Sequence, residues 1–312
     1  MNPFLKRLSA LANFALALIL LSGCEHKELC YDHGHNVEID IRFIWDAAPD
    51  ADPNTMVVNF FTPDGKHFTT REFTSRDGGR MRIEAGEYMI LFHNGEMESV
   101  KEALDVFDRY ALTTNEESLL SPMSRDLGAP PRPTISANEP VRSTAETVWA
   151  GQCTHVMFER NKQGQFVELH PAEATARYTV EVVNVENLRD NIDISAALSG
   201  LSEKLNVSSS SAAGQPVTVP FSIERKDDKT LEARFVTFGH CPEDKSVSHI
   251  VSIYTSSKVY YNFDVTDQVH NAEDDKNIYI RINGLKLPVD GQGVTPSIDG
   301  WEDVEDVIIN MN

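Results

Sequence analysis

The chain has 312 residues, of which 28 are lysine or arginine and 48 are aspartate or glutamate, giving a formal net charge of −20 at pH 7. A chain this acidic repels phosphate backbones and anionic lipid headgroups, which argues against nucleic acid partners and against polybasic docking on membranes. The length is sufficient for two domains of ordinary size, and four cysteines are too few for a disulfide-stabilised scaffold.

The N-terminus has the layout of a secretory signal. Lys6 and Arg7 precede an apolar run, Leu11 to Leu21, that is too short to span a bilayer as a helix. The run ends in Leu21-Ser22-Gly23-Cys24, which resembles the bacterial lipobox. We therefore expect residues 1–23 to be a lipoprotein signal peptide and Cys24 to be lipidated, anchoring the body in the outer membrane at the cell surface. The alternative is a plain signal peptide that is cut elsewhere.

Residues 24–36 are polar and predict a tether. Four side chains within it are possible metal ligands: His26, Cys30, His33 and His35. Such ligands suit zinc or copper, but a metal site also needs partners that orient its ligands, and a flexible tether lacks them. We therefore expect no metal and no cofactor, and metal binding by these four side chains stays open as the alternative.

Three cysteines remain after Cys24, namely Cys30, Cys153 and Cys241. Because three is an odd number, at most one disulfide can form within the chain and one thiol is left over. The sequence leaves open whether Cys30 pairs with Cys153 or with Cys241.

Residues 37–165 predict a first β-sandwich. Short segments of alternating apolar and polar residues are separated by turn sequences such as Pro63-Asp64-Gly65, and this pattern is typical of half-buried strands. The expected strands are residues 37–43, 56–61, 67–73, 81–85, 89–92, 147–150 and 154–158.

Two segments of this first domain depart from the strand pattern. A short helix is expected over Glu98–Ala111, and residues 114–145, which contain many Ser, Pro, Asn and Arg, predict a long surface connection. The helix prediction rests on apolar residues at helical spacing: Val100, Leu104, Phe107 and Ala111.

Residues 166–312 predict a second β-sandwich, with a flexible loop at residues 208–214. Short strands recur at intervals of roughly ten residues, and no helix–strand alternation is present, so the sequence indicates an all-β fold of two sandwiches in series. The expected strands are residues 166–169, 178–185, 193–201, 217–223, 231–238, 248–256, 259–265, 278–282 and 304–309.

Several segments resemble an uncharacterised domain family of Bacteroides-type lipoproteins, which is similar to the fimbrillin superfamily and its FimB-like fimbrial anchors. The resemblance implies two tandem transthyretin-like (fimbrillin-type) β-sandwich domains, an outer-membrane lipid anchor and assembly by strand exchange. No catalytic residue defines the family. The segments that carry the resemblance are the lipobox, His26-Lys27-Glu28-Leu29-Cys30-Tyr31-Asp32-His33, Leu198-Ser199-Gly200-Leu201, Phe235-Val236-Thr237-Phe238-Gly239, Phe263-Asp264-Val265-Thr266-Asp267-Gln268-Val269 and Trp301-Glu302.

A search for catalytic motifs finds none. The chain has no G-x-S-x-G nucleophile elbow, no HExxH and no phosphate-binding glycine loop. Residues 50–54 resemble the start of a calcium loop, but Thr55 replaces the required glycine and Phe61 the required glutamate, so an acidic surface loop is the better interpretation. We therefore expect no catalytic residue and no enzymatic activity.

Two hypotheses for function remain. The first is a lipid-anchored structural or adhesion protein of the cell surface, a fimbria-like subunit or anchor that binds other subunits by strand addition through Val304–Ile309 or Val37–Ile44. The alternative is a glycan-binding surface lipoprotein of a nutrient-uptake system. That alternative requires a solvent-facing aromatic platform, for which the candidates are Trp45, Trp149 and Trp301.

Overall fold

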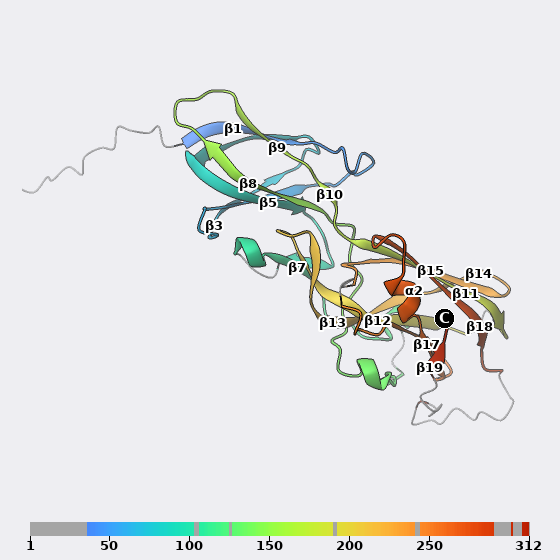
Figure 1. Ribbon diagram of the computed structural model, residues 1–312. Helices are drawn as coiled ribbons and strands as arrows, with labels where there is room; N and C mark the ends of the chain where they lie inside the picture. Colours follow the sequence, from blue (N-terminus) through green and yellow to red (C-terminus); the bar gives the residue numbers. More distant parts are fainter. Residues whose placement is uncertain are drawn as a thin grey trace, which may run out of the picture.

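The computed structural model describes residues 36–102, 106–124, 127–189, 192–240, 244–289, 301 and 308–311, and these residues form an almost entirely β structure (Figure 1). The strands of the first half are β1 (Asn36–Phe43), β2 (Met56–Phe61), β3 (His67–Phe73), β4 (Gly78–Glu84), β5 (Gly86–Asn94), β6 (Val100–Glu102), β7 (Ala111–Thr114), β8 (Trp149–Phe158), β9 (Gln165–Leu169) and β10 (Ala172–Glu173).

The strands of the second half are β11 (Ala176–Glu186), β12 (Ile194–Asn206), β13 (Ser211–Ser222), β14 (Glu224–Asp227), β15 (Thr230–Thr237), β16 (Ile250–Thr255), β17 (Tyr260–Asp264), β18 (Asn277–Lys286) and β19 (Ile308–Asn310). The helical elements are the 3-10 helices η1 (Phe107–Arg109), η2 (Ser121–Met123) and η3 (Thr134–Ser136), and one short α-helix, α2 (Thr266–His270).

The first sandwich packs a three-stranded sheet, β4-β1-β9, on a five-stranded sheet, β10-β8-β5-β2-β3. β1 is antiparallel to β4 and parallel to β9. Strand alternation turns Ile39 and Ile41 of β1 inward, opposite Phe60 and Phe92 of the other sheet, and all four side chains are buried in one core.

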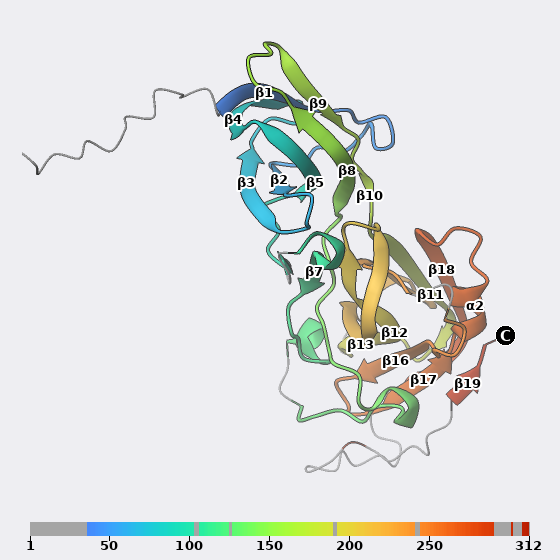
Figure 2. The ribbon, with the colours of Figure 1, turned by 60° about the vertical axis from the view of Figure 1, so that its left-hand side comes forward.

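The second sandwich packs the four-stranded sheet β14-β15-β11-β18 on a larger sheet with the order β19-β17-β16-β12-β7-β6, in which β13 also pairs with β12. Its core includes Tyr178, Val180, Leu198 and Ile280, which are buried, and the stacked rings of Phe221 and Phe235, whose centroids lie 4.1 Å apart. The prediction of tandem β-sandwiches is confirmed. Figure 2 shows the two sandwiches end to end, with β7 and β12 where they meet.

A third apolar cluster joins the sandwiches. Phe61 of β2 and Leu91 of β5 point away from the first core, because they alternate with inward-facing residues of the same strands. They pack instead on Tyr110 and Leu112 around β7 and on Leu205 of β12. The five-stranded sheet is thus buried on both faces at this end, which fixes the first sandwich on the second.

A buried polar network lies beside this cluster. The Tyr110 hydroxyl accepts a hydrogen bond from Asn59 Nδ2 at 3.0 Å and lies 3.1 Å from His93 Nε2, while Glu102 Oε1 is 3.4 Å from the same nitrogen. The hydrogen bond to His93 holds the pKa of Glu102 below its ordinary value, and burial raises the pKa of Tyr110. These titratable groups connect β2 and β5 of the first sandwich to β6 and β7, so their role at this place is structural.

The predicted helix over Glu98–Ala111 is wrong. The chain forms β6, then η1, then β7, and residues 103–105 lie outside the described part. β7 pairs with the far end of β12 and with β6, so the backbone of this segment completes an open sheet edge. Val100 and Phe107 are buried as the periodicity suggested, but the pairing on β12 overrides local helical preference.

Two further expectations differ from the structure. Residues 211–214, expected in a flexible loop, begin β13 and pair with Lys204–Asn206, since β12 continues past Gly200. The boundary expected after residue 165 does not follow the strand pairing: β9 pairs with β1 of the first sandwich, and β6 and β7 join the sheet of the second. The division into domains stays a prediction.

Substitution of Gly78 tests how closely β4 packs on β1. Both Gly78 and Gly65 have positive φ angles, +98° and +82°, but a Cβ at Gly78 would overlap the carbonyl oxygen of Ile41, whereas a Cβ at Gly65 would have no described atom within 4 Å beyond its chain neighbours. Gly65→Ala should cost about 1–2 kcal/mol through backbone strain alone, and Gly78→Ala about 1–3 kcal/mol more through overpacking. Urea unfolding of both variants measures the difference, and equal losses would contradict this account of the β1–β4 contact.

The hydroxyl of Tyr110 offers a second test, on the junction between the sandwiches. Tyr110→Phe leaves Asn59 Nδ2 without its bond to that oxygen in a buried site, which should lower the free energy of unfolding by about 1–3 kcal/mol. Tyr279 is the matched control, because its hydroxyl donates to Glu181 on the surface. Tyr279→Phe should cost less than about 1 kcal/mol. Thermal or urea unfolding that ranks the two variants the other way would exclude a stabilising role for the network.

Candidate functional site

Two incompletely paired strand edges are the candidate interaction sites, because exposed backbone N–H and C=O groups can accept a further strand. The first edge is at the start of β1. β1 pairs with β4 from Asn36 onward, but with β9 only from Ile39 onward. Within the described ranges, the side of residues 36–38 that faces away from β4 therefore has no strand partner.

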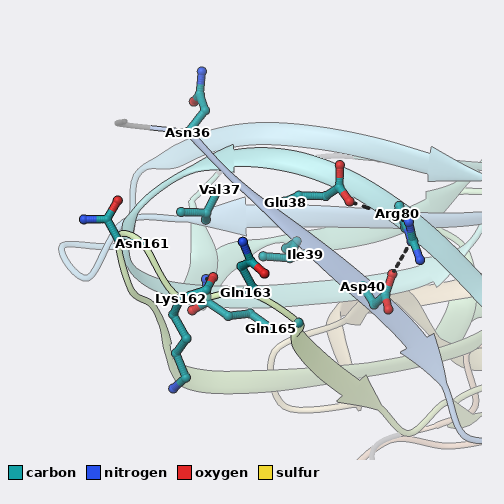
Figure 3. Close-up of a pocket in the computed structure, with 11 residues that line it drawn as sticks. Asn36, Val37, Glu38, Ile39, Asp40, Arg80, Asn161, Lys162, Gln163 and Gln165 are labelled. Atoms are coloured by element: carbon teal, nitrogen blue, oxygen red, sulfur yellow. Dashed lines mark hydrogen bonds and ion pairs between the residues drawn. The ribbon is translucent and has the colours of Figure 1, made fainter. Parts of the chain in front are cut away.

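A groove of about 640 Å³ runs along this open edge. Figure 3 shows β1 between Arg80 of β4 on one side and the turn of residues 161–164 on the other. The polar residues lining the groove are exposed or partly so except Gln165, which is buried, as are Val37 and Ile39 of β1. The groove therefore offers mainly polar side chains and backbone to a ligand.

The turn that forms one wall of the groove is held by Gln165. Its buried side-chain amide donates to the carbonyls of Glu159 and Lys162, each at 3.0 Å, and its Oε1 accepts from the Glu159 N–H at 2.7 Å. Three bonds from one side chain give the turn a fixed shape, so the groove is preformed on this side.

The other wall carries exposed ion pairs. Arg80 lies 3.7 Å from Glu38 and 3.3 Å from Asp40 (Figure 3), and Arg42 lies 3.6 Å from Asp40. Exposed pairs of this kind contribute little to stability, so these charges are available to exchange partners on binding. The arrangement contains no nucleophile–base pair, and it suits recognition of an extended polar chain better than bond-making.

The second edge is at the opposite end of the molecule, at the C-terminus (Figures 1 and 2). β19 has only three residues and runs parallel to β17, with Asn262 opposite Ile308 and Asp264 opposite Asn310. The Met311 N–H donates to the Asp264 carbonyl at 3.3 Å. β19 is the outermost strand of its sheet, and Ile309 is 42% exposed.

Gln268 of α2 holds this edge together. Its amide nitrogen donates to the Met311 carbonyl at 3.2 Å and to the Arg281 carbonyl at 3.0 Å, and its Oε1 accepts from the Arg281 N–H at 2.7 Å. This one side chain therefore bonds to backbone groups from both sheets. It binds Arg281 of β18 in one sheet, and Met311, which follows β19, in the other.

Most of the site residues predicted from the sequence lie outside the described part of the chain. These are Cys24, the four possible metal ligands (His26, Cys30, His33 and His35) and Cys241. Lipidation of Cys24 and metal binding by the tether therefore stay predictions, as does any pairing of Cys30 with Cys241. Of the predicted terminal strand Val304–Ile309, residues 308 and 309 are described, and both are in β19.

Cys153 of β8 is a partly buried free thiol, and burial raises its pKa. The acidic loop after β1 is organised by Arg76: its guanidinium donates to the carbonyls of Ala51 at 2.7 Å and Pro49 at 2.8 Å. In the residues that the structure covers, no group of three or more His, Cys, Asp or Glu side chains is arranged to hold a metal ion.

The three tryptophans do not form an exposed platform. Trp45 is buried, and its ring meets that of Trp149 edge-on, with centroids 6.4 Å apart. Trp149 and Trp301 are partly buried, and Trp301 packs against Tyr254. The glycan-binding alternative required solvent-facing tryptophans, so these side chains give it no support.

The sequence did not reveal Gln165 or Gln268 as organising residues. Each is a single glutamine in a polar position, and its function comes from backbone groups that the fold brings to it. Only the strand pattern of residues 37–43 and 304–309 pointed to the two edges.

Among the helices in the described ranges, none is both long and apolar enough to cross a membrane.

One curated relative is a Bacteroides ovatus protein named as a fimbrium anchoring subunit, Fim4B. It is 25% identical over 103 residues, which are 32% of this chain and 31% of the relative. The match therefore spans about a third of the relative's length.

Two solved structures share the fold over most of the chain. A Bacteroides ovatus protein described as an adhesin matches with a TM-score of 0.60 at 15% identity, over 93% of this chain and 97% of the other. The fimbrial anchor protein Mfa2 from Porphyromonas gingivalis matches with a TM-score of 0.50 at 13% identity, over 79% of this chain and 90% of the other. At these identities the similarity establishes the fold.

The family described as a domain of unknown function, DUF5119, matches residues 23–222, and its relatives confirm the resemblance to Bacteroides-type fimbrial anchors. Because the match covers more than half of the chain, the protein belongs to the DUF5119 family.

Proposed function

We propose that the protein is a lipid-anchored component of a fimbria-like surface assembly, an anchor or adhesion subunit that binds a partner subunit by strand addition. The sequence similarity to a protein named as a fimbrium anchoring subunit supports the assembly. The Leu21-Ser22-Gly23-Cys24 sequence supports the anchor. The observation that carries the mechanism is β19, a strand of three residues in parallel pairing at the edge of β17.

The physical reason is the weakness of this pairing. Parallel pairs are slightly less stable per residue than antiparallel ones, and three residues give few backbone hydrogen bonds. A longer strand from a partner would form more bonds along β17 and would gain affinity from the backbone, with specificity from alternate side chains. β19 is therefore the element that a partner strand replaces.

The positions of the two ends are consistent with an anchor. The tether from Cys24 enters at β1, in the first sandwich, whereas β19 is at the far end of the second (Figure 2). The 12 residues from Cys24 to Asn36 reach about 40 Å when extended. The first sandwich then faces the membrane and the β17 edge faces away from it, toward an incoming subunit, while the β1 groove stays beside the membrane.

Replacement of the lipidated residue tests the anchor. Acyl chains contribute about 0.8 kcal/mol per buried methylene, and two or more anchor a protein stably, so Cys24→Ser should move the protein from the membrane fraction to the soluble fraction. Cys153→Ser, which changes a thiol within β8, should leave the protein in the membrane fraction. Intact mass measurement of the wild-type N-terminus gives the modification directly. A mature protein without acyl chains would rule out this anchor.

Site-specific photo-crosslinking in cells tests strand addition. A photoreactive amino acid at Tyr261, a partly exposed residue of β17, should form a covalent adduct with another surface protein whose crosslinked peptide is a terminal strand. Phe68 is the matched control, because it is 41% exposed and belongs to an edge strand, β3, in the other sandwich. Equal adduct yields from the two positions, or none from Tyr261, would count against partner binding at the β17 edge.

A further inference from the structure

Three histidines form a cluster beside α2: His270 ends the helix, His240 follows β15 and His249 immediately precedes β16. His240, His249 and His270 have ring centroids between 4.9 and 6.1 Å apart. His240 and His249 are buried, and His270 is partly exposed. His240 Nδ1 lies 3.2 Å from the hydroxyl of Tyr178, and its buried Nε2 has no hydrogen-bond partner among the described residues. Buried polar groups without partners are rare, so this cluster requires an explanation.

The contact between His249 and His270 fixes where the protons are. His249 Nδ1 lies 3.2 Å from the Ser199 carbonyl oxygen, which can only accept, so this nitrogen carries the hydrogen. In the neutral ring, Nε2 is then an acceptor. It lies 3.2 Å from His270 Nε2, so His270 is the donor in this pair. A proton added to His270 Nδ1 leaves this bond intact. When His270 carries both of its hydrogens, a further proton on His249 Nε2 points two N–H groups at each other and breaks the bond.

The helix α2 depends on His249 at both of its ends. At the start, the His249 N–H donates to Thr266 Oγ1 and the Val265 N–H donates to the His249 carbonyl, each at 2.9 Å. At the end, the side chain of His249 accepts from His270. A helix of five residues has little stability of its own, so its position is set by its contacts. These are the contacts with His249, the packing of Val269 in the core of the second sandwich, and Lys245, which donates to the His270 carbonyl at 2.7 Å.

The same helix carries Gln268, whose amide binds Met311 and Arg281. A displacement of α2 would therefore remove the side chain that holds the end of β19 beside β18. This chain of contacts couples the protonation state of the cluster to the C-terminal strand.

We propose that the His249–His270 contact is an acid-sensitive latch, which holds α2 and β19 in place while at least one ring is neutral and releases them when both rings are charged. That a partner strand then occupies the β17 edge rests on the proposed function. The release of β19 is a property of the isolated chain and is tested without a partner.

The direction of the pH dependence follows from burial. Burial lowers the pKa of His249 to about 3 and lowers that of His240 as well, and the positive charge of Lys245 adds to the effect of burial in lowering the pKa of His270. Once released, the rings return toward their ordinary pKa of about 6.5. The released state therefore binds more protons below that pH, and the latched state loses stability progressively as the pH falls from about 6.5 toward 3.

Other charged groups around the cluster modify this balance without reversing it. Carboxylates on neighbouring elements raise the histidine pKa values, whereas Lys245 lowers them, and burial is the largest cause for each ring. The titratable and charged groups that face the cluster are Tyr178 of β11, Asp244 and Lys245 before β16, Asp264 of β17, Asp267 of α2 and Asp275 before β18.

Hydrogen exchange of the full chain in detergent tests the latch. Protection factors, corrected for the intrinsic rate at each pH, are compared at pH 7.5 and pH 5.0. In the wild type, the amides of residues 308–311 and of Arg281 should lose protection by about tenfold or more at pH 5.0, since one unit of pKa shift corresponds to a factor of ten. The amides of β1 in the first sandwich should change little.

Replacement of His270 separates the latch from a general effect of acid. His270→Ala removes the contact at a partly exposed position, so residues 308–311 should show the low, acid-like protection already at pH 7.5 and little further change at pH 5.0. His170→Ala, at an exposed position outside the cluster, should behave as the wild type. His249→Gln, a second variant, should also lose the pH dependence.

Three results would overturn the latch. One is protection of residues 308–311 that does not change with pH in the wild type. Another is a His270→Ala variant that keeps wild-type protection. The third is equal loss of protection in all strands at pH 5.0, which would mean that acid unfolds the whole chain instead of releasing its C-terminal strand.

Discussion

The need to pair or cover strand edges is the constraint on which this structure depends. Each sheet ends in backbone N–H and C=O groups that either find partners or stay open to other chains. Short segments pair with these edges: β7 pairs with one end of β12, and β19 pairs with β17. At Arg281 of β18, the side-chain amide of Gln268 forms hydrogen bonds with the backbone N–H and C=O. An edge covered by a short piece is easier to reopen than one covered by a long strand.

The junction holds the two sandwiches, and with them the two strand edges, in a defined position relative to each other. Phe61 and Leu91 extend the packing of the first sandwich into the second, and the Tyr110 hydroxyl links Asn59 with His93 inside the same region. Burial of apolar surface supplies the stability, and the polar network fixes the orientation, because its hydrogen bonds form in only one arrangement. Two flexibly linked sandwiches would hold the β17 edge less reproducibly relative to the first sandwich.

The sequence predicted the all-β class and the position of most strands, because alternation in segments such as residues 37–43 and 230–237 directly reflects burial on one face. It misplaced residues 98–111 and 211–214, where the partner strand β12 decides the conformation and lies far away in the sequence. The two edges could be predicted in part, as terminal strands. The roles of Gln165 and Gln268 could not, since they bind backbone groups that only the folded chain brings together.

The histidine cluster explains why the short helix α2, and not a longer terminal strand, holds the cover of the β17 edge. A permanent cover for β17 could have been built with a longer terminal strand, yet the contact depends on a five-residue helix whose ends are both bound by His249. Val269 packs in the core and holds one face of the helix at any pH, whereas the hydrogen bond between the two imidazoles forms only while one of the two facing nitrogens lacks a hydrogen. Because Gln268 lies within that helix, the strength of the edge cover becomes a function of acidity. In this way the proposed latch makes the opening of the β17 edge depend on a local proton equilibrium in the second sandwich.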